Sequence, residues 1–356
     1  MRAWTKIILI GVLCFCATLS AGAQKISWDS LNQQTLSLTL EGDFTAALKT
    51  AQEALAKAEE SYGRDDRRTA HSLNNLAFIH INQNRSLPQA ESLLVRALKI
   101  YDKKPPSNPS DQVQALNNLA GIYQKKGELS RAETLYSRAL SVSRKAPGKD
   151  SLELAQTLNN LAGLFTAQEK YSRAESLCRR ALAIREKNFG TENPAVTQIL
   201  DNLIYVSAKQ KKFAAAESLC WKVVSSLLKS KTPNLPEVSG YLNNMGTFCF
   251  LQNRPAKAES LFLRALSLRE KTLGAGHPAV AQTIENLAEA CKLQKKYAGL
   301  DSLYERMAAI NEKTLGSNNP SHAAKLEQIA RFFESIGKTE EAKKWAARAQ
   351  RAQPTK

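Results

Sequence analysis

The side chains best suited to chemistry in this sequence are amides that recur in pairs four residues apart. Each pair joins a glutamine to an asparagine, as Gln156 and Asn160 do. An interval of four places both side chains on one face of an α-helix. Since an amide both donates and accepts hydrogen bonds, a row of amides can bind the backbone of an extended peptide without demanding one sequence. The same amides can instead bond one another and hold neighbouring helices together, and the two interpretations do not exclude each other.

The amides belong to a block, Leu-Asn-Asn-Leu-Ala in its clearest copy at 158–162, that returns along almost the whole chain. Successive copies are 42 residues apart, with one interval of 43. A period of this size indicates stacked supersecondary units, each of which buries its apolar face only against its neighbours. We therefore predict one elongated solenoid over residues 24–356. Its copies begin at Leu31, Leu73, Leu116, Leu158, Leu200, Leu242, Ile284 and Leu326.

Each unit has the pattern of two amphipathic helices joined by a tight turn. In the best-formed unit, apolar residues at three- and four-residue steps follow Leu158 in a first helix and Ala174 in a second. Gly190 suits the end of the second helix, and Pro194 is tolerated at the start of the next one. The connections at 105–109 and 231–236 are rich in proline and lack this ending. We expect those two connections to differ in shape.

Three lysines lie toward the ends of predicted first helices, where they would make the rim of a groove basic and favour acidic ligands. Solvated lysines without a role are the alternative. Together with the amides they complete the predicted peptide groove, which consists of Asn75, Gln114, Asn118, Gln156, Asn160, Gln198, Asn202, Asn244, Gln282, Asn286, Lys125, Lys209 and Lys292.

The repeated pattern resembles a known family. The Leu-Asn-Asn-Leu-Ala block, an aromatic-containing turn, Arg-Ala-Glu-x-Leu, Arg-Ala-Leu and a closing Leu-Gly-x-x-x-Pro are similar to the 42-residue tetratricopeptide repeats of the kinesin light chain class. The resemblance covers roughly residues 27–352. It implies an all-α, right-handed superhelical solenoid, here of about eight antiparallel helix pairs, whose first helices line a concave groove. It also implies that the asparagine register of the block touches the ligand.

Signatures of catalysis and of cofactor binding are weak. The segment Gly274-Ala275-Gly276 resembles part of a dinucleotide-binding motif, but no strand is predicted before it. The four histidines show neither metal-ligand spacing nor an evident cysteine, serine or carboxylate partner, and His80 falls in a register of core aromatic residues. We therefore predict that the protein is not an enzyme and holds no cofactor and no metal.

The first 23 residues predict export. A basic start precedes an apolar run from Ile7 to Leu19, which is shorter than the ~20 residues that a membrane-spanning helix needs. Small side chains at Ala21 and Ala23 suit a signal peptidase. We predict cleavage after Ala23 and a periplasmic or secreted location, with an uncleaved anchor as the alternative. No later segment has the sequence of a transmembrane span.

The formal net charge of +17 favours acidic partners. These include nucleic acid, an anionic membrane surface and acidic peptide segments, while a basic surface that only aids solubility is the alternative. Predicted export and the lack of alternating basic and aromatic residues disfavour nucleic acid. A protein or peptide segment is the predicted partner, and the charge favours an acidic one.

Four cysteines follow the export segment, and they form two pairs with 42-residue spacing, Cys178 with Cys220 and Cys249 with Cys291. Because aromatic residues occupy the same registers in other repeats, buried thiols that act as small hydrophobic groups are predicted. An exported protein can form disulfides, and Cys220 with Cys249 is the one pairing between neighbouring helices to test.

These features predict a non-catalytic scaffold of the bacterial cell envelope that holds an extended segment of a partner in a concave, amide-lined groove. The alternative is a sensor or regulatory subunit for a separately encoded signalling kinase or protease. The identity of the partner and the oligomeric state do not follow from the sequence.

Overall fold

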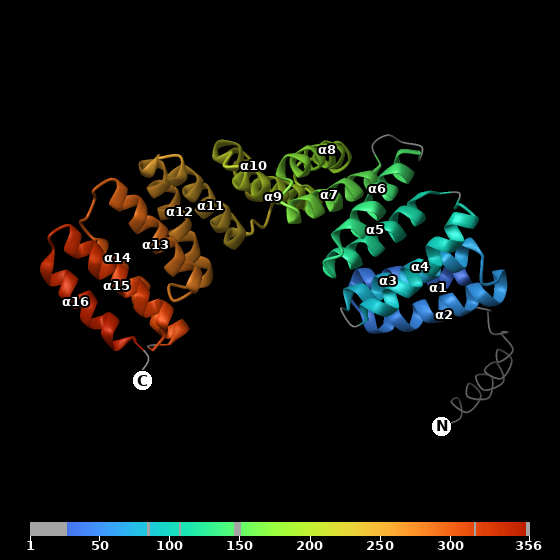
Figure 1. The fold of residues 1–356 in the computed structure, drawn as a ribbon, viewed down its shortest axis with the longest axis horizontal. Helices are drawn as coiled ribbons and strands as arrows, with labels where there is room; N and C mark the ends of the chain where they lie inside the picture. The colour runs from blue at the N-terminus through green and yellow to red at the C-terminus, as the bar shows by residue number, and fades with distance from the viewer. Residues whose placement is uncertain (1–26, 84–85, 107, 146–150, 317, 354–356) are drawn as a thin grey trace, which may run out of the picture. The chain divides into compact units, whose positions relative to one another are not determined.

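The computed structural model describes residues 27–83, 86–106, 108–145, 151–316 and 318–353. Within these ranges the regular structure is α-helical throughout, and sixteen helices follow one another as eight pairs (Figure 1). The predicted all-α repeat fold is thereby confirmed. The predicted signal peptide, residues 1–23, lies outside the described residues.

The helices form two compact units, Met1–Lys149 and Asp150–Lys356, which divide at a boundary between helix pairs. The prediction of one continuous solenoid stays a prediction. Unit 1 contains α1 (Trp28–Glu41), α2 (Phe44–Tyr62), α3 (Arg67–Asn82), α4 (Leu87–Lys103), α5 (Ser110–Lys125) and α6 (Leu129–Lys145). Unit 2 contains α7 (Leu152–Ala167), α8 (Tyr171–Phe189), α9 (Pro194–Lys209), α10 (Phe213–Lys229), α11 (Leu235–Leu251), α12 (Pro255–Leu273), α13 (Pro278–Leu293), α14 (Leu300–Leu315), α15 (Pro320–Ser335) and α16 (Thr339–Arg351).

Local chemistry explains where the helices begin and end. The side chain of Asn193 accepts a hydrogen bond from the Ala195 N–H at 2.9 Å, and Pro194 occupies the first helical position of α9. Gly190 ends α8 with a φ of 76°, a conformation that favours glycine. The connection after α10 differs, as expected: Ser230, which follows the last helical residue, has an extended backbone in place of a left-handed glycine.

Apolar side chains of paired helices form the core of each unit. Leu158 and Ala162 of α7 and Ala174 of α8 are fully buried, and the two small residues let the paired helices approach closely. Packing follows the residue sizes: Gly246 of α11 faces the ring of the buried Phe262. Among the described helices, none combines the length and the apolarity that crossing a membrane requires.

The four cysteines of the described residues are free thiols. The considered pairing of Cys220 with Cys249 is therefore not formed in the structure. Cys178 and Cys220 are fully buried, and burial raises the pKa of each to about 12. The thiols of this pair fill core positions, which makes them poor nucleophiles.

Candidate peptide-binding surface

The two asparagines of the repeated block differ in exposure. The first asparagine is buried in the clearest copies, for example Asn74 and Asn159, whereas the second, as in Asn118 and Asn202, is half-buried. Within each unit, first helices of successive repeats lie side by side, so the second asparagine of one repeat reaches the first asparagine of the repeat before it. The amide side chains of neighbouring first helices therefore contact one another.

Hydrogen bonds join these side chains across repeats. In unit 1, Asn118 Nδ2 donates to Asn74 Oδ1 at 3.1 Å. In unit 2, Asn202 Nδ2 donates to Asn159 Oδ1 at 2.8 Å, and Asn286 repeats the contact with Asn243 at 3.1 Å. Asn75 makes the same bond to Asn32 at 3.3 Å. We call these bonds asparagine clasps; they give the second asparagine a structural role.

The predicted glutamines are the freer amides. Gln114, Gln198 and Gln282 are exposed, each one helical turn before a clasp asparagine. Gln156 differs, because its Nε2 donates to Asn160 Oδ1 at 2.8 Å and its Oε1 accepts from Arg185. Asn244 is exposed as well. The face predicted to hold a peptide thus contains both free amides and amides already bonded.

The three predicted rim lysines have different surroundings. Lys125 is exposed. Lys209 lies 5.4 Å from the centroid of the Tyr205 ring. Lys292 is half-buried and donates to Glu289 at 2.9 Å, so its charge is partly neutralised within the protein. Contact of any of the three lysines with a ligand stays a prediction.

A hollow of about 560 Å³ opens on the first helices of unit 1, α1, α3 and α5. We call it the amide hollow. Three predicted groove residues, Asn75, Gln114 and Asn118, line it. Two large apolar side chains also line it, Leu36 with 60% and Phe78 with 41% of their surface exposed. The remaining lining residues are Asn32, Gln33, Thr35, Thr39, His71, Asn74 and Asp111.

Sequence reasoning missed Leu36 and Phe78, although a signal was present. Both stand three residues after the second-asparagine register of their repeat, and Tyr205, with half of its surface exposed, has the same place in unit 2. Two other repeats have Gly121 and Gly163 there. The residue type three positions after the second asparagine, apolar in some repeats and glycine in others, would have predicted an apolar surface with hollows on the first helices.

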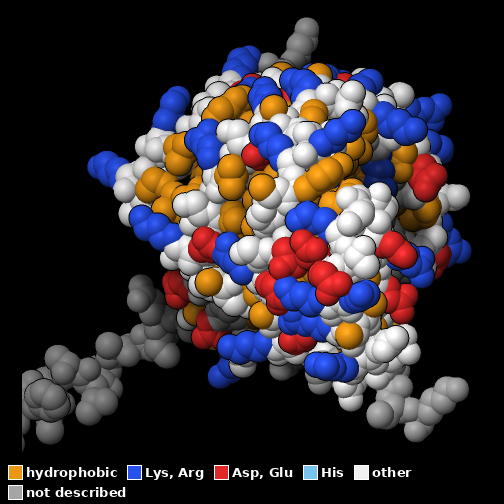
Figure 2. All heavy atoms as spheres, turned by 90° about the vertical axis from the view of Figure 1, so that its left-hand side faces the viewer, with side chains coloured by type: hydrophobic (Ala, Val, Ile, Leu, Met, Phe, Trp, Pro, Cys, Tyr) orange, Lys and Arg blue, Asp and Glu red, His pale blue; other side chains and the backbone are white. Residues whose placement is uncertain are grey.

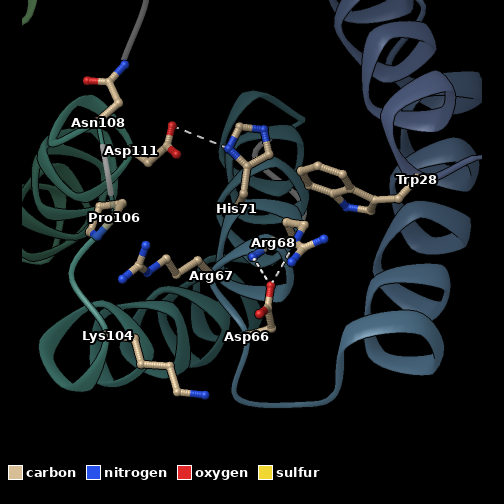
Figure 3. A pocket seen from close by; sticks show the side chains of 9 residues that line it. All are labelled: Trp28, Asp66, Arg67, Arg68, His71, Lys104, Pro106, Asn108 and Asp111. Atoms are coloured by element: carbon tan, nitrogen blue, oxygen red, sulfur yellow. Dashed lines mark hydrogen bonds and ion pairs between the residues drawn. The ribbon is translucent and has the colours of Figure 1, made fainter.

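A second hollow, of about 580 Å³, adjoins the amide hollow because His71 and Asp111 line both. Its walls carry charges from the starts of α3 and α5 and from the connection after α4 (Figure 3). His71 Nδ1 lies 3.3 Å from a carboxylate oxygen of Asp111. Arg67 and Lys104 line the hollow and form no ion pair with any described residue, although the charge of Lys104 also acts on Asp66 in the same wall.

Within the described residues, no group of three or more His, Cys, Asp and Glu side chains is placed to hold a metal ion. In the view of Figure 2, Lys and Arg side chains are scattered over the visible face, with hydrophobic side chains between them and smaller groups of Asp and Glu. The arrangement can supply hydrogen bonds, apolar contact and positive charge to a bound chain.

Comparison with known proteins identifies the repeat. A family model described as tetratricopeptide repeat matches residues 31–103, 111–187 and 237–299. No curated protein sequence matches the chain.

Several solved structures share the all-α superhelical repeat fold. BtubC (BKLC) from P. vanneervenii is 21% identical with a TM-score of 0.54, and the match covers 69% of this chain and 93% of that one. A putative kinesin light chain from Podosopora anserina, whose own repeats are nearly identical to one another, is 21% identical to this chain. Its TM-score is 0.51, and the match covers 58% of this chain and 97% of that one. A signal transduction ATPase with a tetratricopeptide repeat sensor from Pyrococcus horikoshii is 16% identical with a TM-score of 0.64, covering 80% and 42%.

Proposed function

We propose that this chain, which belongs to the tetratricopeptide repeat family, is a non-catalytic scaffold that holds an extended segment of a partner protein against its first helices. The amide hollow of unit 1 carries the proposal. It combines exposed amides with the exposed side chains of Leu36 and Phe78. An extended peptide presents backbone groups and side chains to such a surface, and it needs both kinds of contact.

Prior ordering of the surface lowers the cost of binding. The clasp from Asn118 to Asn74 and the buried leucines hold the first helices before any ligand arrives, so little side-chain freedom remains to be lost there. Gln114 has its amide exposed beside the clasp. In this proposal the clasps hold the surface in shape and the glutamines contact the peptide.

The adjoining charged hollow supports an acidic ligand. Arg67 and Lys104 are free of ion pairs with described residues, and they lie next to the amide hollow through the shared residues His71 and Asp111. A carboxylate of the bound segment would find complementary charge there. If this pairing contributes to binding, the affinity of the protein for the acidic segment should fall as salt is added.

A matched pair of single substitutions tests the proposal. Phe78→Asp places a charge inside the amide hollow, whereas Val95→Asp places the same charge on α4, outside the hollow, where 36% of Val95 is exposed. The full chain and each variant are immobilised, and proteins recovered from extract of the source cells are quantified by mass spectrometry. We expect at least one partner to be recovered about tenfold less with Phe78→Asp and equally with Val95→Asp.

Circular dichroism melts establish that both variants are folded. Equal recovery of every protein by a folded Phe78→Asp variant would reject the amide hollow as the binding surface. Co-purification of a kinase or protease, lost with the same variant, would favour the alternative function as a regulatory subunit.

We also propose that the chain is exported to the periplasm or secreted, on the basis of its first 23 residues. Mass spectrometry of the mature protein tests this proposal. A chain that begins at Gln24 supports export with cleavage, and a chain in the cytoplasm that still carries these residues contradicts it.

A further inference from the structure

Ion pairs connect the second helices of successive repeats in a regular ladder. In unit 2, Glu186 of α8 pairs with Lys222 of α10, and Glu270 of α12 pairs with Arg306 of α14. Each cation follows its acid by 36 residues, as it does for Asp102 with Arg138 in unit 1 and for Glu312 with Arg348 at 2.8 Å. An acid late in one second helix thus meets a cation in the middle of the next.

Within the described residues of unit 2, one rung of this ladder is missing, between α10 and α12. Leu228 of α10 stands 42 residues after Glu186, in the acid register, and Arg264 of α12 stands 42 residues after Lys222, in the cation register. No carboxylate of the described residues lies within ion-pairing distance of Arg264. Arg264 is exposed.

An apolar hollow of about 490 Å³ lies at the same place, between α10, α11 and α12. Leu228 and Leu263 line it with 47% and 48% of their surface exposed, and Arg264 forms part of its wall. Leu235, the first residue of α11, also lines it. We call this surface the Arg264 site.

α10 carries a second large, exposed apolar side chain. Trp221 occupies the register of Leu263 one repeat earlier, and 41% of it is exposed. The next repeats on either side have Arg179 and Glu305 in that register. Apolar side chains have therefore replaced charged ones on two neighbouring second helices, at the point where the ion-pair ladder is broken.

We propose that the Arg264 site docks an acidic, apolar segment of a partner protein. A large apolar side chain of the segment lies between Leu228 and Leu263, and a carboxylate beside it pairs with Arg264 in place of the missing acid. Arginine suits this role because its guanidinium group binds a carboxylate through two parallel hydrogen bonds. The site lies in unit 2 and shares no residue with the amide hollow of unit 1.

Leu228→Glu is the decisive variant, because it restores the acid of the ladder and removes the apolar wall in one step. A displayed library of random peptides is selected on the immobilised full chain and counter-selected on the Leu228→Glu chain. We expect the selected peptides to carry a Leu-like side chain close to an acidic one. Leu228→Glu should weaken their binding about tenfold, while the melting temperature and the ligands of the amide hollow stay unchanged.

Charge exchange separates the proposed pairing from simple apolar adhesion. Replacing the acidic residue of a selected peptide by lysine should abolish binding to the wild-type chain and restore binding to Arg264→Glu. The proposal is overturned if no peptide distinguishes the wild type from a folded Leu228→Glu variant, or if the peptides bind Arg264→Glu unchanged. A dimer that Leu228→Glu dissociates would also overturn it, because the occupant would then be a second copy of the chain.

Discussion

Asn118 donates its Nδ2 hydrogen to the Oδ1 of Asn74, 44 residues earlier in the sequence, at a distance of 3.1 Å. Asn74 is almost fully buried, whereas Gln114, one turn before Asn118 on the same helix, is exposed. Two amides of the same predicted face therefore have different tasks. Asn118 joins the two repeats, and Gln114 is available to a ligand.

The first prediction separates these tasks by stability. Asn118→Ala leaves the buried carbonyl of Asn74 without its donor and should lower the free energy of unfolding by about 1 kcal/mol. Gln114→Ala removes an exposed amide and should change it by less than about 0.5 kcal/mol. Urea denaturation at pH 7 measures both. Equal losses for the two variants would show that the clasp does not stabilise the fold.

A second prediction concerns Gly246. A Cβ added there would stand 2.5 Å from the Cε1 of Phe262, whose ring is buried. Gly246→Ala should therefore destabilise the protein by about 1–3 kcal/mol through overpacking, and Phe262→Leu in the same chain should recover part of the loss. Gly163→Ala is the control, since a Cβ there meets nothing within 4 Å. If Gly246→Ala and Gly163→Ala change the melting temperature equally, the packing argument is disproved.

The third prediction is a pH dependence at Glu175. The hydrogen bond from Lys212 at 2.7 Å, supported by Arg179 and Gln210, lowers the pKa of Glu175 to about 2 from its ordinary 4.5. A lowered folded-state pKa adds stability that is fully present above pH 4.5 and is lost as the pH falls toward 2. Glu175→Gln should cost about 1 kcal/mol at pH 7 and clearly less at pH 3.5. Glu340→Gln, at an exposed position, is the control. If the stability loss of Glu175→Gln does not vary with pH, Glu175 is not the source of the pH dependence.

The fourth prediction concerns His80, which is 6% exposed and whose Nε2 has no hydrogen-bond partner among the described residues. Burial lowers the pKa of His80 from its ordinary 6.5. The unfolded chain then takes up a proton at a higher pH than the folded chain, so stability falls as the pH drops below 6.5. His80→Phe should remove the contribution of His80 to this loss of stability. Urea denaturation at pH 8 and pH 5.5 measures the loss in the wild type and in the variant. Identical losses in wild type and variant would exclude His80 as the source.

The fold could be predicted from the sequence because its information is local and repeated. Leucines and alanines at three- and four-residue steps around Leu158, and endings such as Gly190-x-x-x-Pro194, specify helices and turns within single repeats. The 42-residue period then requires that the same unit be stacked. The tetratricopeptide repeat family follows from that pattern, and the family model confirms it. Solved repeats of the kinesin-light-chain type share the fold.

The candidate site could be predicted only in part. The glutamine and asparagine registers were visible as a four-residue interval, and the structure brings Asn75, Gln114 and Asn118 to one hollow. Leu36 and Phe78 were missed because an apolar residue on a helix is first taken as core.

The sequence by itself determined the helices, their pairing and the repeat, because each depends on residues at most one repeat apart and on a pattern that recurs. The tertiary structure alone decided which amides are bonded and which remain free, and that Arg264 faces Leu228 instead of an acid. Such contacts join side chains about 36 to 44 residues apart across stacked helices. Their distances and exposure depend on how the helices pack, and packing is a property of the assembled units.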